Sequence, residues 1–192
     1  MRRGFTLLEI LISLGVFSIA VFIILTVLFS VSDAQKKTIA VQNAQDNLRY
    51  AFEAMTKEIR TGKVFHCGTG GSLTSPQNCA YPNGESSFTF RNSAGQVVTY
   101  QVISNQLVKS SNGTIPCDPD PNDVTDCQKI TAIDLVLIDK MVFYADGTLG
   151  SDSAQSRVTI VLDGEVQDPR NIGTAKINLQ TTVSKRGLID QP

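Results

Sequence analysis

One acidic side chain stands out in this sequence because it lies inside a run of apolar residues. Glu9 is the only ionisable residue between Arg3 and Asp33, and the run from Leu7 to Val31 is almost entirely apolar. A carboxylate costs about 2.5–3.5 kcal/mol near the centre of a membrane-spanning helix, so a charge there is a candidate functional site. The position of Glu9 near the start of the run would also let it reach the lipid headgroups, which explains why the charge is tolerated.

The bond between Gly4 and Phe5 lies just before this apolar run. If the chain is cut there, the new amino group of Phe5 lies four residues before Glu9, about one helical turn away. In lipid, this ammonium group and the carboxylate can neutralise each other, within one chain or between neighbouring chains.

The four cysteines predict disulfides and an oxidising compartment, because an even number follows a membrane signal in a small domain. Three pairings are possible, and we favour the local one, Cys67–Cys79 with Cys117–Cys127. Each short loop closed in this way would stabilise the domain by about 3 kcal/mol. Zinc is disfavoured, because the sequence has no Cys-x-x-Cys pair and its one histidine, His66, directly precedes Cys67.

The other candidate sites are weak. Asp118, Asp120 and Asn122 resemble the start of a calcium loop, but Asp123 replaces the required glycine and Lys129 replaces the bidentate glutamate. We therefore expect a solvated, disulfide-closed loop, no metal and no cofactor. A membrane-anchored hydrolase needs a nucleophile and a base at a recognisable spacing, which His66 and the scattered Asp and Ser residues do not provide, so no enzyme is predicted.

The elements that must position these residues begin with one long helix. The 25 residues of the apolar run would span about 38 Å as a helix, against a hydrocarbon core of about 30 Å, which is too long for a cleaved signal peptide. No proline occurs up to Thr61, and Gly62 is a plausible C-cap. The second half is amphipathic, with apolar residues every three or four positions: Ile39, Val41, Ala44, Leu48, Ala51, Phe52, Met55 and Ile59.

Alternating apolar and polar residues predict antiparallel strands in the remainder of the chain. The expected strands are Ser87–Arg91, Val97–Ile103, Gln106–Ser110, Lys140–Ala145, Arg157–Asp163 and Thr174–Lys185. Residues 62–86 are predicted to form a loop, and residues 111–129 interrupt the strand pattern. The expected fold class is α+β, with a long N-terminal helix, transmembrane in its first half, packed against an antiparallel β-sheet domain.

The first nine residues resemble the class III signal of type IV pilins and type II secretion pseudopilins. A short basic leader, Gly4, Phe5 and then Glu9 at the fifth position after the cut match the motif. The resemblance implies that prepilin peptidase cleaves after Gly4 and N-methylates Phe5. It also implies that Glu9 pairs with the Phe5 amine of a neighbouring subunit during assembly. Thr26 is a departure, because many major pilins have a helix-kinking proline there.

A second segment, residues 47–60, resembles minor pseudopilin J of type II secretion and its counterpart, minor pilin W of type IV pili. The strands also resemble the two-part sheet of that group. The resemblance implies a place in a tip complex that primes assembly. Its implied partners are minor subunits of types I or V and K or X, major subunits of types G or A, membrane lipid and the assembly platform in the membrane.

The predicted organisation is a leader at residues 1–4, a transmembrane and assembly helix at 5–32, an amphipathic helix at 33–61 and an extracytoplasmic β-sheet domain at 62–192. The protein is predicted in the cytoplasmic (inner) membrane as a single-pass subunit, and then in a pilus or pseudopilus. Residues 1–61 have a net charge of +2 and residues 62–192 of −3, so nucleic acid is not expected as the main partner. A ligand-binding adhesin or DNA-uptake subunit of the same filament class remains the alternative, and a hydrolase a weaker one.

Overall fold

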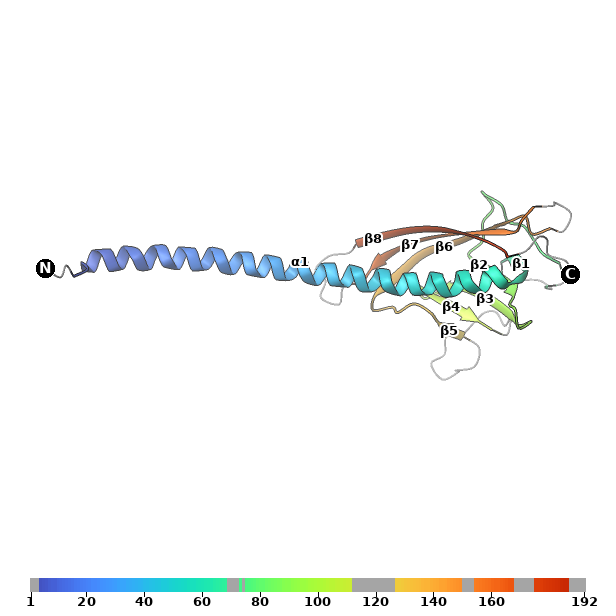
Figure 1. The fold of residues 1–192 in the computed structure, drawn as a ribbon, viewed down its shortest axis with the longest axis horizontal. Coiled ribbons are helices and arrows are strands. Elements are labelled where there is room, and N and C mark those ends of the chain that lie inside the picture. Colours follow the sequence, from blue (N-terminus) through green and yellow to red (C-terminus); the bar gives the residue numbers. More distant parts are fainter. Residues whose placement is uncertain are drawn as a thin grey trace. The chain divides into compact units, whose positions relative to one another are not determined.

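The computed structural model of the protein describes residues 4–68, 73, 75–111, 127–149, 154–167 and 175–186. In these residues the chain forms helix α1 (Leu7–Thr61) and strands β1 to β8 (Figure 1). The chain divides into two compact units, Met1–Ile39 and Ala40–Pro192. The units are described separately below.

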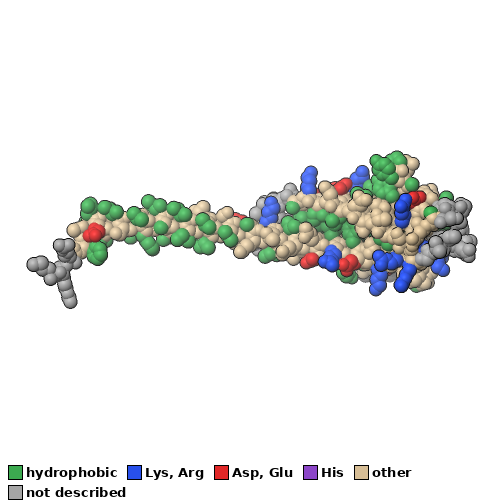
Figure 2. Space-filling model, turned by 45° about the horizontal axis from the view of Figure 1, so that its top comes forward, with side chains coloured by type: hydrophobic (Ala, Val, Ile, Leu, Met, Phe, Trp, Pro, Cys, Tyr) green, Lys and Arg blue, Asp and Glu red, His purple; other side chains and the backbone are tan. Residues whose placement is uncertain are grey.

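The first unit contains the N-terminal part of α1, whose apolar side chains face outward. An 18-residue window of this helix has a mean hydropathy of 2.8, so the described chain contains one helix that is long and apolar enough to cross a membrane. Figure 2 shows apolar side chains all along this part. The hydroxyl groups here are satisfied locally, since Ser13, Ser18 and Thr26 each donate to the carbonyl oxygen four residues earlier, at 2.7–2.9 Å.

The second unit begins with the C-terminal part of α1, which has one buried stripe. The fully buried residues recur every three or four positions: Ala44, Leu48, Ala51, Met55 and Ile59. All five belong to the predicted stripe, because residues at this spacing lie on one face of a helix. The helix ends at Thr61, where the backbone N–H of Gly62 donates to the carbonyl of Ile59.

Two antiparallel sheets accompany this part of the helix in an α+β, pilin-like fold (Figure 1). The first sheet has the strand order β1 (Lys63–Cys67), β2 (Ser87–Arg91), β3 (Val97–Ile103), β4 (Gln106–Ser110) and β5 (Cys127–Lys129). The second sheet has the order β6 (Val136–Asp146), β7 (Arg157–Val166) and β8 (Ala175–Ser184). The fold class predicted from the sequence is therefore confirmed.

An aromatic cluster in the core joins the two sheets. Phe65 of β1 and Phe143 of β6 both pack on Phe88 of β2, with ring centroids 5.7 and 5.6 Å apart respectively. All three rings are completely buried, and each such ring contributes a large apolar area to folding.

A polar cluster ties α1 to the first sheet. The hydroxyl of Tyr100 donates to the Glu58 carboxylate at 2.7 Å, and the Lys109 ammonium group pairs with the same carboxylate. Burial raises the pKa of the Tyr100 phenol, and its hydrogen bond to Glu58 and the negative charge of that residue raise it further. The cluster satisfies a tyrosine hydroxyl that would otherwise be buried without a partner.

The prediction of a loop over residues 62–86 is wrong at its start, because Lys63–Cys67 forms β1 and pairs with β2. The register shifts between Lys63 and His66, and Val64 has a positive φ of 54°. The strand has only five residues and lies between Gly62 and a glycine-rich stretch, so the composition of the segment indicated a loop. The predicted interruption at 111–129 also ends earlier than expected, since Cys127–Lys129 forms the short strand β5.

Strand β8 forms where predicted but is not buried on one face as its alternation indicated. Of its ten residues only Val183 is buried, while Ile177 and Thr181 are half-buried and Leu179 is exposed. The alternation predicts only which side chains point toward the core. Their burial also requires a neighbouring element on each side of the strand, and β8 is the last strand of its sheet, so it has a neighbouring strand on one side only.

Candidate functional site

The predicted processing segment, Gly4–Glu9, begins in exposed, non-helical backbone. Residues 4–6 are not helical, and α1 starts at Leu7. No other group lies within 4 Å of the position that a Cβ would take on Gly4, and the Phe5 side chain is 78% exposed. The peptide bond between Gly4 and Phe5 is therefore accessible and free of helical hydrogen bonds, as a protease substrate requires.

Thr6 and Glu9 form a capping box at the start of α1. The Thr6 hydroxyl accepts a hydrogen bond from the Glu9 backbone N–H at 3.3 Å, and the Glu9 carboxylate accepts one from the Thr6 backbone N–H at 3.5 Å. The carboxylate gives the Thr6 N–H a partner, and the Glu9 N–H is shared between the Thr6 hydroxyl and the Thr6 carbonyl oxygen, the latter at 3.1 Å. This role was not predicted from the sequence, although the Thr-x-x-Glu spacing before an apolar run is its usual signal.

The capping role leaves the charge of Glu9 without a counter-ion. In the part of the chain that the structure describes, the four ion pairs all lie elsewhere, and the Glu9 side chain is exposed. Residues 1–3, with both arginines of the leader, lie outside the described residues. The geometry thus places an unneutralised carboxylate on the apolar part of α1, within the first turn of the helix.

The cysteine predictions are only partly covered by the described chain. A disulfide joins Cys67 to Cys79, the local pairing that the sequence favoured, with their Cα atoms 6.1 Å apart. Cys67 lies in β1, and the backbone of Cys79 pairs with Ala145 of β6, so this bond links the two sheets. Cys127 lies in β5, but Cys117 lies outside the described residues, and its predicted pairing with Cys127 stays a prediction.

The predicted histidine and the search for metal ligands can be checked in the described residues. His66 is half-buried in β1 and faces Thr89 in the register of β2. No group of three or more His, Cys, Asp or Glu side chains that could hold a metal ion occurs among the residues with a described position. Asp118, Asp120, Asn122 and Asp123 of the calcium-like segment lie outside that set.

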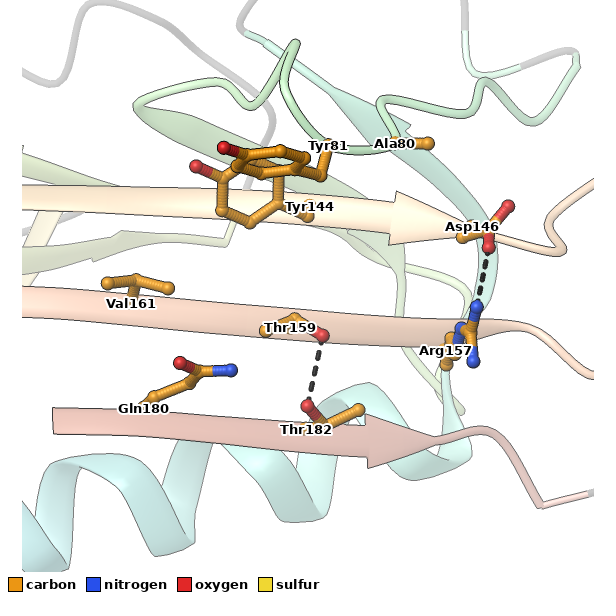
Figure 3. Close-up of a pocket in the computed structure, with 9 residues that line it drawn as sticks. All are labelled: Ala80, Tyr81, Tyr144, Asp146, Arg157, Thr159, Val161, Gln180 and Thr182. Atoms are coloured by element: carbon orange, nitrogen blue, oxygen red, sulfur yellow. Dashed lines mark hydrogen bonds and ion pairs between the residues drawn. The ribbon is translucent and has the colours of Figure 1, made fainter.

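A shallow hollow of about 560 Å³ lies on the polar face of the second sheet (Figure 3). The rings of Tyr81 and Tyr144 meet there with centroids 5.8 Å apart, and Arg157 pairs with Asp146 at 2.9 Å. The remaining lining residues are Ala80, Thr159, Val161, Gln180 and Thr182. These residues were not predicted as a site from the sequence, because they come together only when Tyr81, from the segment before β2, lies beside β6.

Comparison with known proteins identifies the N-terminal segment. Residues 1–29 match the family model described as the prokaryotic N-terminal methylation motif. This match supports a type IV pilin-like protein that is processed by prepilin peptidase and assembles with other pilins, and it suggests a structural subunit rather than an enzyme. The motif and the apolar helix together fit a single-pass membrane anchor.

The remainder of the chain has no counterpart in these comparisons. No curated protein and no solved structure matches the sequence.

Proposed function

We propose that this protein is a minor pilin or pseudopilin, a structural subunit of a type IV pilus or a type II secretion pseudopilus. Prepilin peptidase removes residues 1–4 and methylates the amino group of Phe5. Residues 5–32 then hold the subunit in the inner membrane and later in the filament, residues 33–61 continue the helix, and residues 62–192 form the extracytoplasmic domain.

One observation supports this proposal most: the methylation motif at residues 1–29 coincides with an apolar helix whose single acid, Glu9, has no counter-ion among the described residues. The Phe5 ammonium group created by cleavage supplies the missing charge. Transfer into an apolar bundle is costly for either ion alone and much less so for the pair. Pairing between subunits therefore lets both charges enter the apolar bundle together, which favours assembly.

Within the filament, we place the subunit in the tip complex that primes assembly, beside minor subunits of types I or V and K or X and above major subunits of types G or A. The resemblance of residues 47–60 to minor pseudopilin J supports this placement. A tip subunit also needs fewer self-contacts than a shaft subunit, which suits the long segments containing glycine and proline that separate the strands in the sequence.

Mass spectrometry of the protein purified from membranes tests the proposal. The expected N-terminal peptide begins at Phe5 and carries one methyl group on its amine. A strain without prepilin peptidase is the control, and should yield the peptide that begins at Met1. An intact leader in the wild-type strain would contradict the proposal.

The second candidate is a ligand-binding role within the same filament class, as an adhesin or DNA-uptake subunit. The hollow beside Tyr81 and Tyr144 favours it, because aromatic rings next to hydroxyl and amide groups are common in binding sites, and the Tyr81 ring is exposed. Replacement of Tyr81 by Ala should then abolish adhesion or DNA uptake but leave the number of filaments unchanged. A parallel loss of filaments and of adhesion or DNA uptake would favour the purely structural role.

A further inference from the structure

The second sheet has one covered edge and one open edge. The covered edge is β6, whose backbone bonds to the segment that follows the disulfide: Cys79 and Glu85 donate to Ala145 and Phe143 at 2.8 and 3.0 Å. The open edge is β8, which pairs with β7 and with no other strand of the described chain. Among the described residues, no backbone bond outside that ladder reaches residues 176–183.

The open edge has few of the features that normally prevent strands from associating. The β7–β8 ladder runs through ten consecutive pairs without a bulge, and β8 contains no proline and one charged residue, Lys176. In an antiparallel edge strand about half of the backbone N–H and C=O groups point away from the sheet. Such a row is a template for another strand unless charges, bulges or prolines block it.

The core is also incomplete beside β8. Leu162 of β7 and Leu179 of β8 face each other directly in the ladder, yet Leu162 is fully buried and Leu179 is 38% exposed. An apolar side chain on the inner face that stays this exposed lacks a neighbour on its outer side. A further strand beyond β8 would supply that neighbour.

A groove of about 430 Å³ lies in this position, between α1 and β8. It touches the consecutive residues Leu179, Gln180 and Thr181. Consecutive strand residues point to opposite faces, so a groove that contacts all three lies along the edge of β8 rather than over one face. The remaining lining residues are Gln45, Asp46, Arg49, Phe52 and Ile177, which give an apolar floor and a polar rim.

We propose that the edge of β8 is a strand-addition site, which binds an extended segment of another subunit of the filament. The segment pairs with the backbone of residues 176–183 and places apolar side chains, at every second position, into the groove beside Phe52 and Leu179. Backbone hydrogen bonds supply affinity in this mode of recognition, and the groove supplies specificity. The identity of the partner class rests on the proposed function.

The direction of β8 favours a different subunit over a second copy of this chain. Arg186, just after β8, donates its backbone N–H to the carbonyl of Arg60 near the end of α1, while the groove joins Leu179 to the earlier residue Phe52. Strand β8 and the adjacent part of α1 therefore run the same way. A symmetric β8–β8 pair would be antiparallel and would oppose the two helices, whereas a screw-symmetric filament keeps its subunits in one orientation.

Hydrogen exchange of the full-length processed protein in detergent micelles tests the proposal. In the protein alone, about half of the β8 amides should exchange rapidly while those of β7 are protected. The protein is then mixed with each other methylation-motif subunit of the same genome, purified singly. One of them should protect residues 176–183 and leave β2 unchanged. Complete protection of β8 in the protein alone, or no new protection with any subunit, would overturn the proposal.

A matched pair of variants separates edge binding from general effects. Leu179→Lys puts a charge at the groove and should weaken the complex about tenfold, which corresponds to about 1.4 kcal/mol. Ser93→Lys adds the same charge to the exposed turn between β2 and β3 and should change affinity less than about twofold. Equal effects of the two, or protection of β8 by self-association, would refute the assigned partner. The proposed function is tested separately, by cleavage after Gly4 and methylation of Phe5. If processing is correct and the exchange or affinity experiments fail, only the strand-addition site is refuted.

Discussion

Glu9 has two roles at the residue scale that can be separated by substitution. Its carboxylate caps the helix start together with Thr6, and its charge is available to a neighbouring subunit. A glutamine in place of Glu9 preserves the capping geometry but removes the charge, whereas a valine in place of Thr6 removes a capping hydroxyl but preserves the charge.

We expect Glu9→Gln to insert in the membrane and to lower incorporation into filaments at least about tenfold, since the Phe5 ammonium loses its partner in an apolar bundle. Thr6→Val should cost about 1 kcal/mol of helix stability and leave incorporation within about twofold. The ratio of subunit in sheared filaments to subunit in membranes, measured by quantitative immunoblot, checks both. Normal assembly of Glu9→Gln would show that the cap, and not the charge, matters.

Because of Tyr100, the free energy of unfolding should decrease as the pH rises into the alkaline range. Its pKa is raised in the folded protein, so the folded state holds the proton more tightly than the unfolded state. The stabilisation is fully present below about pH 10, where the phenol is neutral in both states, and it falls by up to about 1.4 kcal/mol per pH unit above that. Urea unfolding of the full chain in micelles at pH 8 to 11 should show this slope in the wild type.

Tyr100→Phe should remove that slope and lower stability at pH 8 by about 1–2 kcal/mol, because the hydrogen bond to Glu58 is lost. Tyr50→Phe is the control, since Tyr50 is 68% exposed and should change neither quantity. The same alkaline slope in Tyr100→Phe as in the wild type would assign the effect to other groups.

At the scale of elements, the sequence predicted what local periodicity determines. Strands β2, β3 and β4 have the predicted bounds because they alternate regularly and are separated by turns with positive φ at Gly95, Ser104 and Asn105. Strand β1 was missed because its five residues lie within a segment rich in glycine, serine, proline and asparagine, and β5 because it has three residues and depends on pairing with β4. The exposure of β8 and the hollow beside Tyr81 depend on tertiary neighbours, which periodicity does not encode.

Gly62 marks the junction between α1 and β1, and it has a packing role in addition to its place at the helix end. A Cβ on Gly62 would lie 2.6 Å from Cδ2 of Phe90 and 3.2 Å from Cε1 of Phe65, two fully buried rings. The glycine is therefore required by the close approach of the helix end to the aromatic cluster.

Gly62→Ala should destabilise the second unit by about 1–3 kcal/mol, because rigid rings must move to admit the methyl group. Gly15→Ala is the control, because no atom lies within 4 Å of its Cβ position. Thermal unfolding followed by near-ultraviolet circular dichroism should show a lower midpoint for the first variant only. Equal midpoints for Gly62→Ala and the wild type would mean that the junction is loosely packed.

At the scale of the whole molecule, the main structural question is what holds the two sheets of the second unit together. Phe88 stacks on Phe143 across them, the backbone of Ile138 in β6 bonds to Asn105 between β3 and β4, and the Cys67–Cys79 disulfide fixes β1 to the segment that covers the β6 edge. Of these, the disulfide is the one link that depends on the redox compartment.

The double variant Cys67→Ala/Cys79→Ala should lower the free energy of unfolding by about 2–4 kcal/mol, because the unfolded chain regains the entropy of an open loop. Its hydrogen exchange should rise at Ala145 and Phe143, whose edge is then held by backbone bonds alone. Reductant should raise hydrogen exchange at these two amides in the wild type to the level seen in the variant. The variant measured with and without reductant shows how much of that rise comes from the other two cysteines, Cys117 and Cys127. Unchanged exchange along β6 would mean that packing of Phe88 on Phe143, and not the disulfide, keeps the β6 edge covered. In either case β8 is the edge of this sheet that is open to a partner.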